Sequence, residues 1–584
     1  MLGKSVAIDG DVIVVGAPFL GKVFVYTRPS SGWTSMNEVA ELRVSAGNPS
    51  YWQFGSSVAV QGDTIAVGAL DWEAPGEPGY YSRGAVFVYE KPASGWQGVI
   101  TETARLTSSD PDITQRLGHS VAISGDTIVA GAPLVSLGGG TFDNYGAVYV
   151  FTRNGSSWTN STQTARLIAS DRGARDELGN AVAISGNTIV ASAYQANIGA
   201  NVAAGALYVF EKPPGGWADS VEVAKLHASD GANDDAGDNL GDALAFDGNT
   251  ILAGRPWTNF VTPRGIQYGV GAVFVFSRPP GGWSGVLTEN AMLRVSDAKE
   301  DDGVGSAVAF WGDTALVGIP YYGDPVTGEG RGAIAMFRRP SSGWSGVLFE
   351  DSKMLPSDPM EGDSFGESVA VSGSVAVVGA PYRSIAGLRD VGHAYVFEQQ
   401  ALCTAVPRTG CKQVASTASG KPAIALLRPR ADRAYDRVVF RWKPGQATTM
   451  AEFGDPSLDR TYALCVYDET PSGFVLLVDT TASPGGVCAN KPCWRLNRSG
   501  TKWLFRNPEL TPDGMLRMDL QSGPDGSARV VAVAKGYRAG VPPLPVQQAT
   551  RVVAQVVNDL GTCWSAEFTA PAKKNTDKKF TDSD

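Results

Sequence analysis

The chain has 584 residues, enough for two or three domains, and its 70 Gly, 35 Pro and 18% charged residues favour many short strands and turns. No apolar run reaches the roughly 18 residues that a membrane-spanning helix needs, which argues against membrane insertion. Residues 1–400 carry 25 Lys and Arg against 42 Asp and Glu, so a nucleic-acid partner is not expected. Residues 401–584 carry 24 against 17, scattered along the sequence, and we interpret this excess as an ordinary solvated surface.

A motif of alternating apolar residues followed by Gly-Ala-Pro recurs along the first 400 residues. One such segment is "LGHSVAISGDTIVAGAP" at 117–133, and another is "FGESVAVSGSVAVVGAP" at 365–381. A regular period of about 60 residues is typical of repeat architectures. Aligned on the Gly of Gly-Ala-Pro, the copies fall at Gly16, Gly68, Gly131, Ser192, Gly254, Gly318 and Gly379.

Each copy predicts four short antiparallel strands. An alternating strand such as 57–60 leads into a tight turn such as Gly125-Asp126, where Gly supplies the positive φ of a two-residue hairpin. A second apolar strand ends at the Pro, and a variable loop leads to a third strand such as 84–89. A turn ending in Trp and a short fourth strand close the copy. We interpret the recurring Trp residues as structural pegs: Trp33, Trp96, Trp158, Trp217, Trp283 and Trp344.

Four strands per copy, repeated seven times, predict an all-β fold in which residues 1–400 form a seven-bladed β-propeller. One sheet cannot bury both of its faces alone, whereas sheets stacked in a ring can. A linear β-solenoid is the alternative, but its coils are shorter and do not need four strands each.

The copies resemble FG-GAP repeats, the family that forms the integrin α-subunit propeller and occurs in bacterial extracellular proteins. The first half of that motif is present at Phe54-Gly55 and Phe365-Gly366, and the second half is complete at 16–18, 131–133 and 379–381. The resemblance implies an extracellular or cell-surface binding protein whose ligand face carries the loops. The family's calcium loop is replaced here by a turn too short to wrap six to eight oxygens around Ca²⁺, so neither calcium at that place nor any cofactor is expected.

The loops between the second and third strands hold aromatic and cationic residues that could recognise a protein or a glycan. The alternative is that half of them pack the loops down. The candidate ligand-binding residues are Trp72, Tyr81, Tyr145, Tyr194, Trp257, Arg264, Tyr321, Tyr322, Tyr382 and Arg383.

The connections between successive copies are acidic. The longest offers a candidate cation site of hard oxygen ligands at Asp230, Asn233, Asp234 and Asp238. The alternative, which we favour, is that these Asp side chains cap turn amides.

No catalytic constellation is visible. His119 occupies a variable polar position, which the other copies fill with Lys4, Ser56, Asn180, Asp242, Ser306 and Glu367. A hydrolase or lyase that uses carboxylates from separate blades stays an alternative, as does a purely structural scaffold.

Residues 401–420 predict a linker, 421–570 a β-sandwich-like domain and 571–584 a disordered tail. The domain resembles an uncharacterised C-terminal module of secreted bacterial proteins. An even number of cysteines in this region indicates disulfides in an oxidising compartment, with reduced thiols as the alternative. These cysteines are Cys403, Cys411, Cys465, Cys488, Cys493 and Cys563.

The short fourth strand occurs only six times, since after Phe397 the chain enters the predicted linker. We therefore expect an N-terminal fragment that lacks a signal peptide and a closing strand; the alternative is a three-stranded seventh blade. The sequence as a whole predicts a secreted or surface-attached, non-catalytic and monomeric binding protein, adhesive in function.

Overall fold

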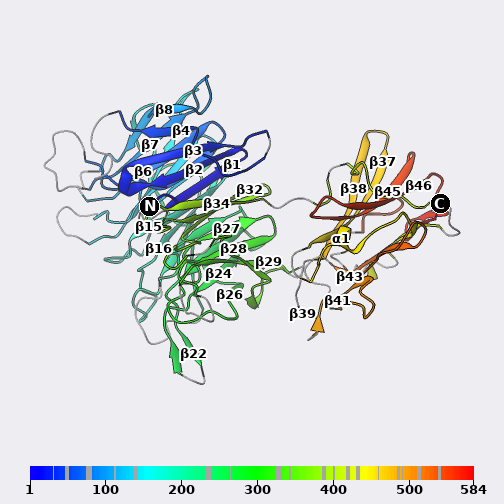
Figure 1. Cartoon of the computed structure of the whole chain (residues 1–584). Helices are drawn as coiled ribbons and strands as arrows, with labels where there is room; N and C mark the ends of the chain where they lie inside the picture. Colours follow the sequence, from blue (N-terminus) through cyan, green and yellow to red (C-terminus); the bar gives the residue numbers. More distant parts are fainter. Residues whose placement is uncertain are drawn as a thin grey trace. The chain divides into compact units, whose positions relative to one another are not determined.

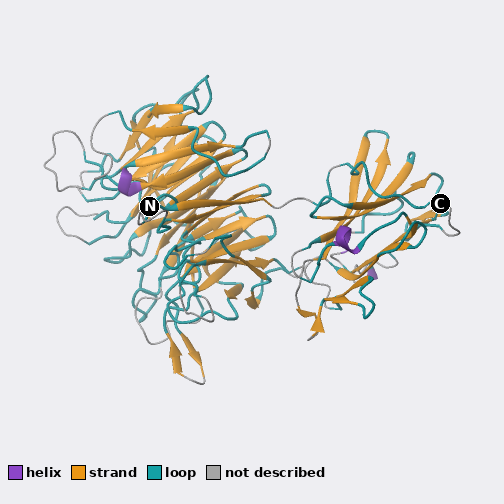
Figure 2. Ribbon diagram, in the orientation of Figure 1, coloured by secondary structure: helices purple, strands orange, loops and turns teal. Residues whose placement is uncertain are grey.

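The computed structural model is almost entirely β (Figure 2) and divides into two compact units, Met1–Gln399 and Gln400–Asp584. It describes residues 1–583 except 31, 46–51, 74–81, 111–113, 137–142, 230–238, 263–264, 324–329, 341–342, 359, 385–389, 399–401, 405, 416–420, 429–434, 458–459, 483–486, 489–490, 509–513, 537–538 and 540.

The described residues of unit 1 form seven main sheets, and the first three or four strands of each sheet come from one copy of the repeat (Figure 1). The first strands are β1 (Ser5–Asp9), β5 (Phe54–Gln61), β10 (Val121–Ser124), β15 (Leu178–Ser185), β20 (Leu244–Phe246), β27 (Val308–Trp311) and β32 (Ser368–Ser372). The second are β2 (Val12–Ala17), β6 (Thr64–Ala69), β11 (Thr127–Ala132), β16 (Thr188–Ala193), β21 (Thr250–Arg255), β28 (Thr314–Ile319) and β33 (Val375–Ala380).

The outer strands complete each sheet. The third strands are β3 (Lys22–Thr27), β7 (Ala85–Glu90), β12 (Ala147–Thr152), β17 (Ala206–Glu211), β24 (Ala272–Ser277), β29 (Ala333–Arg338) and β34 (His393–Glu398). The fourth are β4 (Ala40–Arg43), β9 (Ala104–Thr107), β14 (Ala165–Ile168), β19 (Ala224–His227), β26 (Ala291–Arg294) and β31 (Ser352–Met354). A 3-10 helix (Pro18–Leu20) and the hairpin of β22 (Phe260–Thr262) and β23 (Gly265–Gln267) lie in loops.

The sheets close into a ring. Their first strands touch in a cycle that runs β1, β5, β10, β15, β20, β27, β32 and back to β1. Apolar side chains fill each junction between neighbouring sheets, including the last one, where Val6, Ile13 and Val15 pack against Val375 and Val377. The β-propeller and the all-β fold are therefore confirmed, and the burial explains why a single copy would not be stable alone.

A fifth strand joins five of the described sheets, and the sequence did not predict it. It comes from the Trp turn of the following copy and runs parallel to the fourth strand, so it ties neighbouring sheets together. These strands are β8 (Gly98–Thr101), β13 (Ser161–Thr162), β18 (Ser220–Val221), β25 (Gly285–Thr288) and β30 (Gly346–Phe349).

The seventh sheet has three strands among the described residues, β32, β33 and β34. Val396 of β34 is 37% exposed, whereas Val25 at the equivalent place in β3 is fully buried. The junction with the first sheet nevertheless repeats the contact found elsewhere, because Leu2 bridges Gly392 as Leu117 bridges Gly84.

Unit 2 is a β-sandwich whose two sheets share one apolar core. The larger sheet runs β41 (Trp494–Leu496), β42 (Lys502–Arg506), β43 (Met515–Gln521), β44 (Ala528–Lys535), β36 (Arg437–Gly445), β35 (Ala423–Leu427), β48 (Lys579–Asp582), β47 (Lys574–Thr576). The smaller runs β38 (Gly473–Ala482), β37 (Tyr462–Thr470), β45 (Arg551–Asn558), β46 (Cys563–Thr569). One helical turn, α1 (Met450–Phe453), and the pair β39 (Val487–Cys488) and β40 (Lys491–Pro492) complete the unit.

Two boundaries predicted from the sequence are wrong. The tail 571–584 is not disordered: β47 and β48 form a hairpin, β48 pairs with β35, and Phe580 is fully buried in the core. The predicted linker 401–420 is largely part of unit 2, because its two cysteines form disulfides with Cys465 and Cys563. The third disulfide joins Cys488 to Cys493, so all six cysteines are paired.

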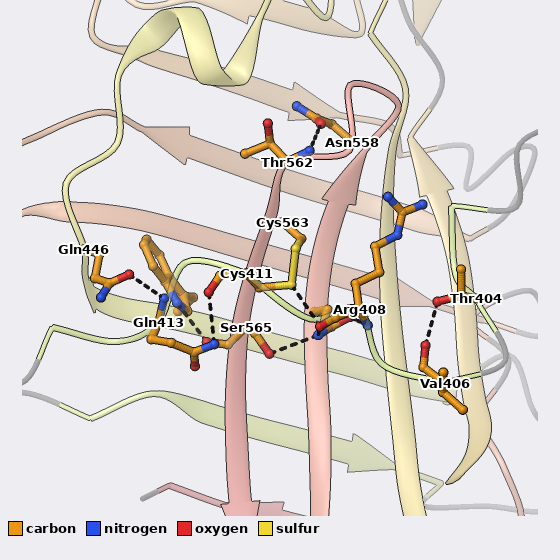
Figure 3. The surroundings of a disulfide bond; sticks show 12 residues. Thr404, Val406, Arg408, Cys411, Gln413, Gln446, Asn558, Thr562, Cys563 and Ser565 are labelled. Atoms are coloured by element: carbon orange, nitrogen blue, oxygen red, sulfur yellow. Dashed lines mark hydrogen bonds between the residues drawn. A yellow bond between two sulfur atoms is a disulfide. The ribbon is translucent and has the colours of Figure 1, made fainter.

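Figure 3 shows how the start of unit 2 is fastened beside the Cys411–Cys563 disulfide. The carbonyl of Arg408 accepts a hydrogen bond from Gln555 Nε2 at 2.9 Å. The backbone amide of Gln413 donates to Gln446 Oε1 at 2.9 Å. These bonds make residues 408–413 an ordered part of the sandwich domain and not a flexible linker.

Candidate ligand-binding face of the propeller

The polar position that follows each Leu-Gly or Phe-Gly pair lies within two residues of the start of a first strand. Lys4 Nζ of the first copy lies 2.5 Å from Glu367 Oε1 of the seventh. Asn180 Nδ2 donates to the backbone carbonyl of Asp242 in the next sheet at 3.5 Å. Five residues of this variable position therefore interact across the ring and form an axial cluster: Lys4, His119, Asn180, Asp242 and Glu367.

The charges in this axial cluster perturb one another. Burial raises the pKa of Asp242 to about 6, the Glu367 carboxylate adds to the rise, and Lys4 opposes it. Burial works against the charge of Lys4, but Glu367 outweighs it and raises the pKa of Lys4. Burial lowers the pKa of His119, which also interacts with the Asn180 side chain. The axial cluster thus combines the ammonium group of Lys4, the carboxyl groups of Asp242 and Glu367, and the neutral side chains of His119 and Asn180, in a partly buried environment.

An arc of aromatic side chains runs over four sheets, and two of its members, Tyr321 and Tyr382, interact with Lys4 of the axial cluster. The residue directly after Gly-Ala-Pro, or after its weakened form, is aromatic in the fifth, sixth, seventh and first copies, which are consecutive around the ring. Phe19 is 60% exposed, Trp257 43% and Tyr321 45%, while Tyr382 is half-buried. Burial raises the pKa of Tyr321, and both Glu367 and Tyr382 contribute, so Tyr321 interacts with a carboxylate of the axial cluster and with the next tyrosine of the arc.

A hollow of about 550 Å³ lies in the same arc, between the fifth and sixth sheets. Trp257 and Tyr321 line it together with the acidic connection Lys299–Asp302. Asp302 is nearly buried and accepts a hydrogen bond from the Lys299 amide at 2.7 Å, and burial raises its pKa to about 6. The hollow therefore combines two exposed aromatic faces with carboxylates on one wall.

Some of the candidate ligand-binding residues lie elsewhere than expected. Trp72 is 5% exposed, covered by Arg105 and packed edge-on against Trp52, so its prediction as a ligand contact is wrong. Arg383 is also buried: its Nη2 lies 2.8 Å from Asp358 Oδ2 and its Nη1 lies 2.7 Å from Asp363 Oδ2. Arg383 thus fixes a connection between two sheets and is not available to a ligand.

Three tyrosines of the candidate set are half-buried in local contacts. Tyr322 donates to Asp297 at 2.9 Å, and Tyr145 to Asp143 at 3.3 Å. The Tyr194 hydroxyl accepts a hydrogen bond from Gln195 Nε2 at 2.8 Å. Only Trp257 and Tyr321 of the described candidates are well exposed, and Phe19, which the sequence analysis did not select, joins them.

The remaining candidates fall outside the described residues. These are Tyr81, Arg264 and the whole proposed cation site, Asp230, Asn233, Asp234 and Asp238. Within the described ranges, no group of three or more His, Cys, Asp or Glu side chains is arranged to hold a metal ion.

In three other acidic connections the last Asp caps a turn, whereas the Asp of each Ser-Asp pair (Asp171, Asp297 and Asp358) accepts a hydrogen bond from a tyrosine hydroxyl. Asp176, Asp302 and Asp363 each accept a hydrogen bond from the backbone amide three residues earlier. The turn Trp residues are likewise structural: Trp96, Trp158, Trp217, Trp283 and Trp344 are all at most 6% exposed.

No helix in the described part of the chain is both long enough and apolar enough to cross a bilayer.

Comparison with known families matches the FG-GAP repeat at residues 100–151, 161–210 and 348–397. No curated protein matches the chain. FG-GAP repeats suggest a ligand-binding or adhesion-type module. Unit 1 is therefore a β-propeller in which three segments match the FG-GAP repeat.

Proposed function

We propose that the protein binds a protein or glycan ligand on the loop face of the propeller, as a secreted or surface-attached, monomeric adhesion protein without catalytic activity. One observation carries the proposal: Trp257 and Tyr321 expose their aromatic rings on the neighbouring fifth and sixth sheets, and Tyr321 also interacts with the charged axial cluster of Lys4, Asp242 and Glu367.

Exposed aromatic groups at matched positions of a rigid ring need an explanation beyond folding. Elsewhere in the repeat, aromatic rings at equivalent positions are buried, as the turn Trp residues show. Trp and Tyr contribute large contact areas at little cost in side-chain entropy, which is why they dominate the energetics of many binding sites. The carboxylates and Lys4 beside them supply the polar groups that orient a ligand.

The three disulfides of unit 2 support the proposed location, because such bonds persist in oxidising compartments. The ring is held together by apolar junctions, parallel fifth strands, capped turns and the Leu2–Gly392 bridge. The loops are free of this role, so their sequence and length can vary to suit a ligand.

The test is a binding screen of the full chain against a glycan microarray and a panel of immobilised extracellular-matrix proteins. We expect saturable binding to at least one probe and a loss of about tenfold or more in affinity for Trp257→Ala combined with Tyr321→Ala. The matched control is Val286→Ala combined with Val347→Ala, since both valines are exposed but lie on the outermost strands β25 and β30.

Equal binding by both double variants would place the ligand elsewhere and overturn the proposed site. Turnover of a bound glycan, lost on Asp242→Asn, would overturn the non-catalytic part of the proposal and favour a hydrolase or lyase.

A further inference from the structure

Unit 2 gathers basic side chains on the outer face of its larger sheet. Directly opposed residues of antiparallel strands share a face, so the strand register assigns each residue to one side. Arg441 lies opposite Val531, which lies opposite Asp519; Arg517 lies opposite both Val533 and Arg506. The same alternation gives the basic face: Arg437, Arg441, Lys443, Lys502, Arg506, Arg517, Arg529, Lys535, Lys574 and Lys579.

The opposite side of these strands is the sandwich core, where Phe440, Trp442, Val530 and Leu520 are fully buried. The basic residues are therefore confined to the solvent side by the period of the strands. They come from six strands that are far apart in sequence, which is why the excess of positive charge looked scattered along the chain.

Few carboxylates balance this charge among the described residues. Asp519 is fully buried on the face and is shared by three cations, at 3.2 Å from Lys502, 2.8 Å from Arg506 and 2.5 Å from Arg517. Although burial works against its charge, hydrogen bonds from Arg517 and Arg506 lower the pKa of Asp519 to about 2, so it stays ionised. In the described part of the chain, Arg437, Arg441, Lys443 and Arg529 have no carboxylate within ion-pair distance.

The centre of the basic face is hollowed. A groove of about 540 Å³ is lined by six of the basic residues over an apolar floor of Val531, Val533 and Leu516. Within it, Nε of Arg529 is buried without a hydrogen-bond partner. A buried donor with no partner is costly, and an acceptor supplied by a ligand would satisfy it.

The arrangement also costs stability. Arg437 lies directly opposite Lys535, and like charges in such a pair destabilise a sheet, whereas Asp519 offsets the charges of the opposed pair Arg506 and Arg517. An anion that lies across the strands would relieve the repulsion between Arg437 and Lys535.

We propose that this groove binds a linear acidic polysaccharide that carries carboxylate or sulfate groups. Arg side chains bind such groups through two parallel hydrogen bonds, and their spacing over several strands suits an extended polyanion. No aromatic residue lines the groove on which nucleic-acid bases could stack. A sheet face offers no free backbone groups to a peptide strand, and no large apolar side chain of the groove is exposed to enter a bilayer.

The test measures binding of the full chain to polygalacturonate and to dextran sulfate, with neutral dextran as the uncharged control. We expect binding to at least one of the charged polymers, weakened by added salt, and none to neutral dextran. Arg441→Gln combined with Arg529→Gln should weaken that binding about tenfold or more. Should this variant not fold, Lys443→Gln with Lys535→Gln serves as the second test, since both lysines are exposed.

The matched control is Arg172→Gln combined with Arg339→Gln, which removes the same charge from exposed positions of unit 1. Its affinity should stay within about twofold of the unaltered chain. Absence of binding to both charged polymers, or an equal loss in the control, would overturn the proposal. Tighter binding to phosphatidylglycerol vesicles or to duplex DNA would overturn the choice of ligand. So would salt-sensitive self-association that Arg441→Gln with Arg529→Gln abolishes.

Discussion

The glycines of the two halves of the repeat motif touch each other across the junction between neighbouring sheets. A Cβ built on Gly131 would lie 1.8 Å from the carbonyl oxygen of Gly179, and one on Gly379 would lie 2.0 Å from that of Gly3. The second contact joins the last sheet to the first. The glycine of the second half of the motif in one copy therefore packs against the glycine of the first half in the next copy, so both positions need glycine for the same reason.

Gly131→Ala should destabilise the propeller by about 3 kcal/mol, because the added methyl group meets rigid backbone on the next sheet. Thermal denaturation followed by circular dichroism measures this. Gly215→Ala is the control, since a Cβ there meets nothing within 4 Å, and it should change stability by less than about 0.5 kcal/mol. An equal effect of the two substitutions would contradict the packing argument.

The raised pKa of Asp242 predicts that the free energy of unfolding depends on pH. Its folded pKa of about 6 lies above the unfolded value, so the folded protein holds the proton more tightly and loses stability as pH rises from about 4 to 6. Above that window the loss is constant. Asp242→Asn should therefore stabilise the protein by about 2 kcal/mol at pH 7 and leave it unchanged at pH 3.5.

Urea denaturation at the two pH values tests this, with Glu361→Gln, an exposed acid, as the control. The same gain at both values would assign the effect to packing or hydrogen bonding instead of charge.

At the scale of the strand, the first three strands of each copy could be predicted because their information is local: alternation, a Gly turn and a closing Pro. The parallel fifth strand could not, since a segment such as Ser161–Thr162 has no pattern of its own and pairs only because β9 of the previous copy lies beside it. Site residues divide in the same way. The exposure of Trp257 follows from its loop, but the burial of Trp72 depends on Arg105, and that of Arg383 on two distant carboxylates.

The terminal hairpin shows how composition misleads. The segment "KKNTDKKFTDSD" is polar enough to predict disorder, yet β48 adds to β35 and directs Phe580 into the core. Phe580→Ala should cost about 4 kcal/mol and lower the unfolding temperature of unit 2. Lys578→Ala, at the exposed tip of the same hairpin, should have almost no effect. Equal and small effects of the two substitutions would contradict the ordered hairpin and support the disorder that the composition predicts.

At the scale of the whole molecule, the two units differ in charge and in covalent bonding. The excess of acid lies in unit 1 and the excess of base in unit 2, where the strand register collects it on one face. Counting charges along the sequence showed the imbalance but not the face, because face membership depends on which strands become neighbours.

The disulfides predict that reduction acts on one unit alone. All three lie in unit 2, and Cys411–Cys563 closes a sequence separation of 152 residues, which on chain-entropy grounds stabilises that unit by about 5 kcal/mol. In calorimetry, dithiothreitol should lower the unfolding temperature of unit 2, which is the transition that Phe580→Ala also lowers. The unfolding temperature of unit 1, which Gly131→Ala lowers, should stay unchanged. Removing only Cys488–Cys493, which closes a separation of 5, should shift the unit 2 transition far less. If reduction moved both transitions together, the units would unfold as one body, and the propeller would depend on the sandwich for its stability.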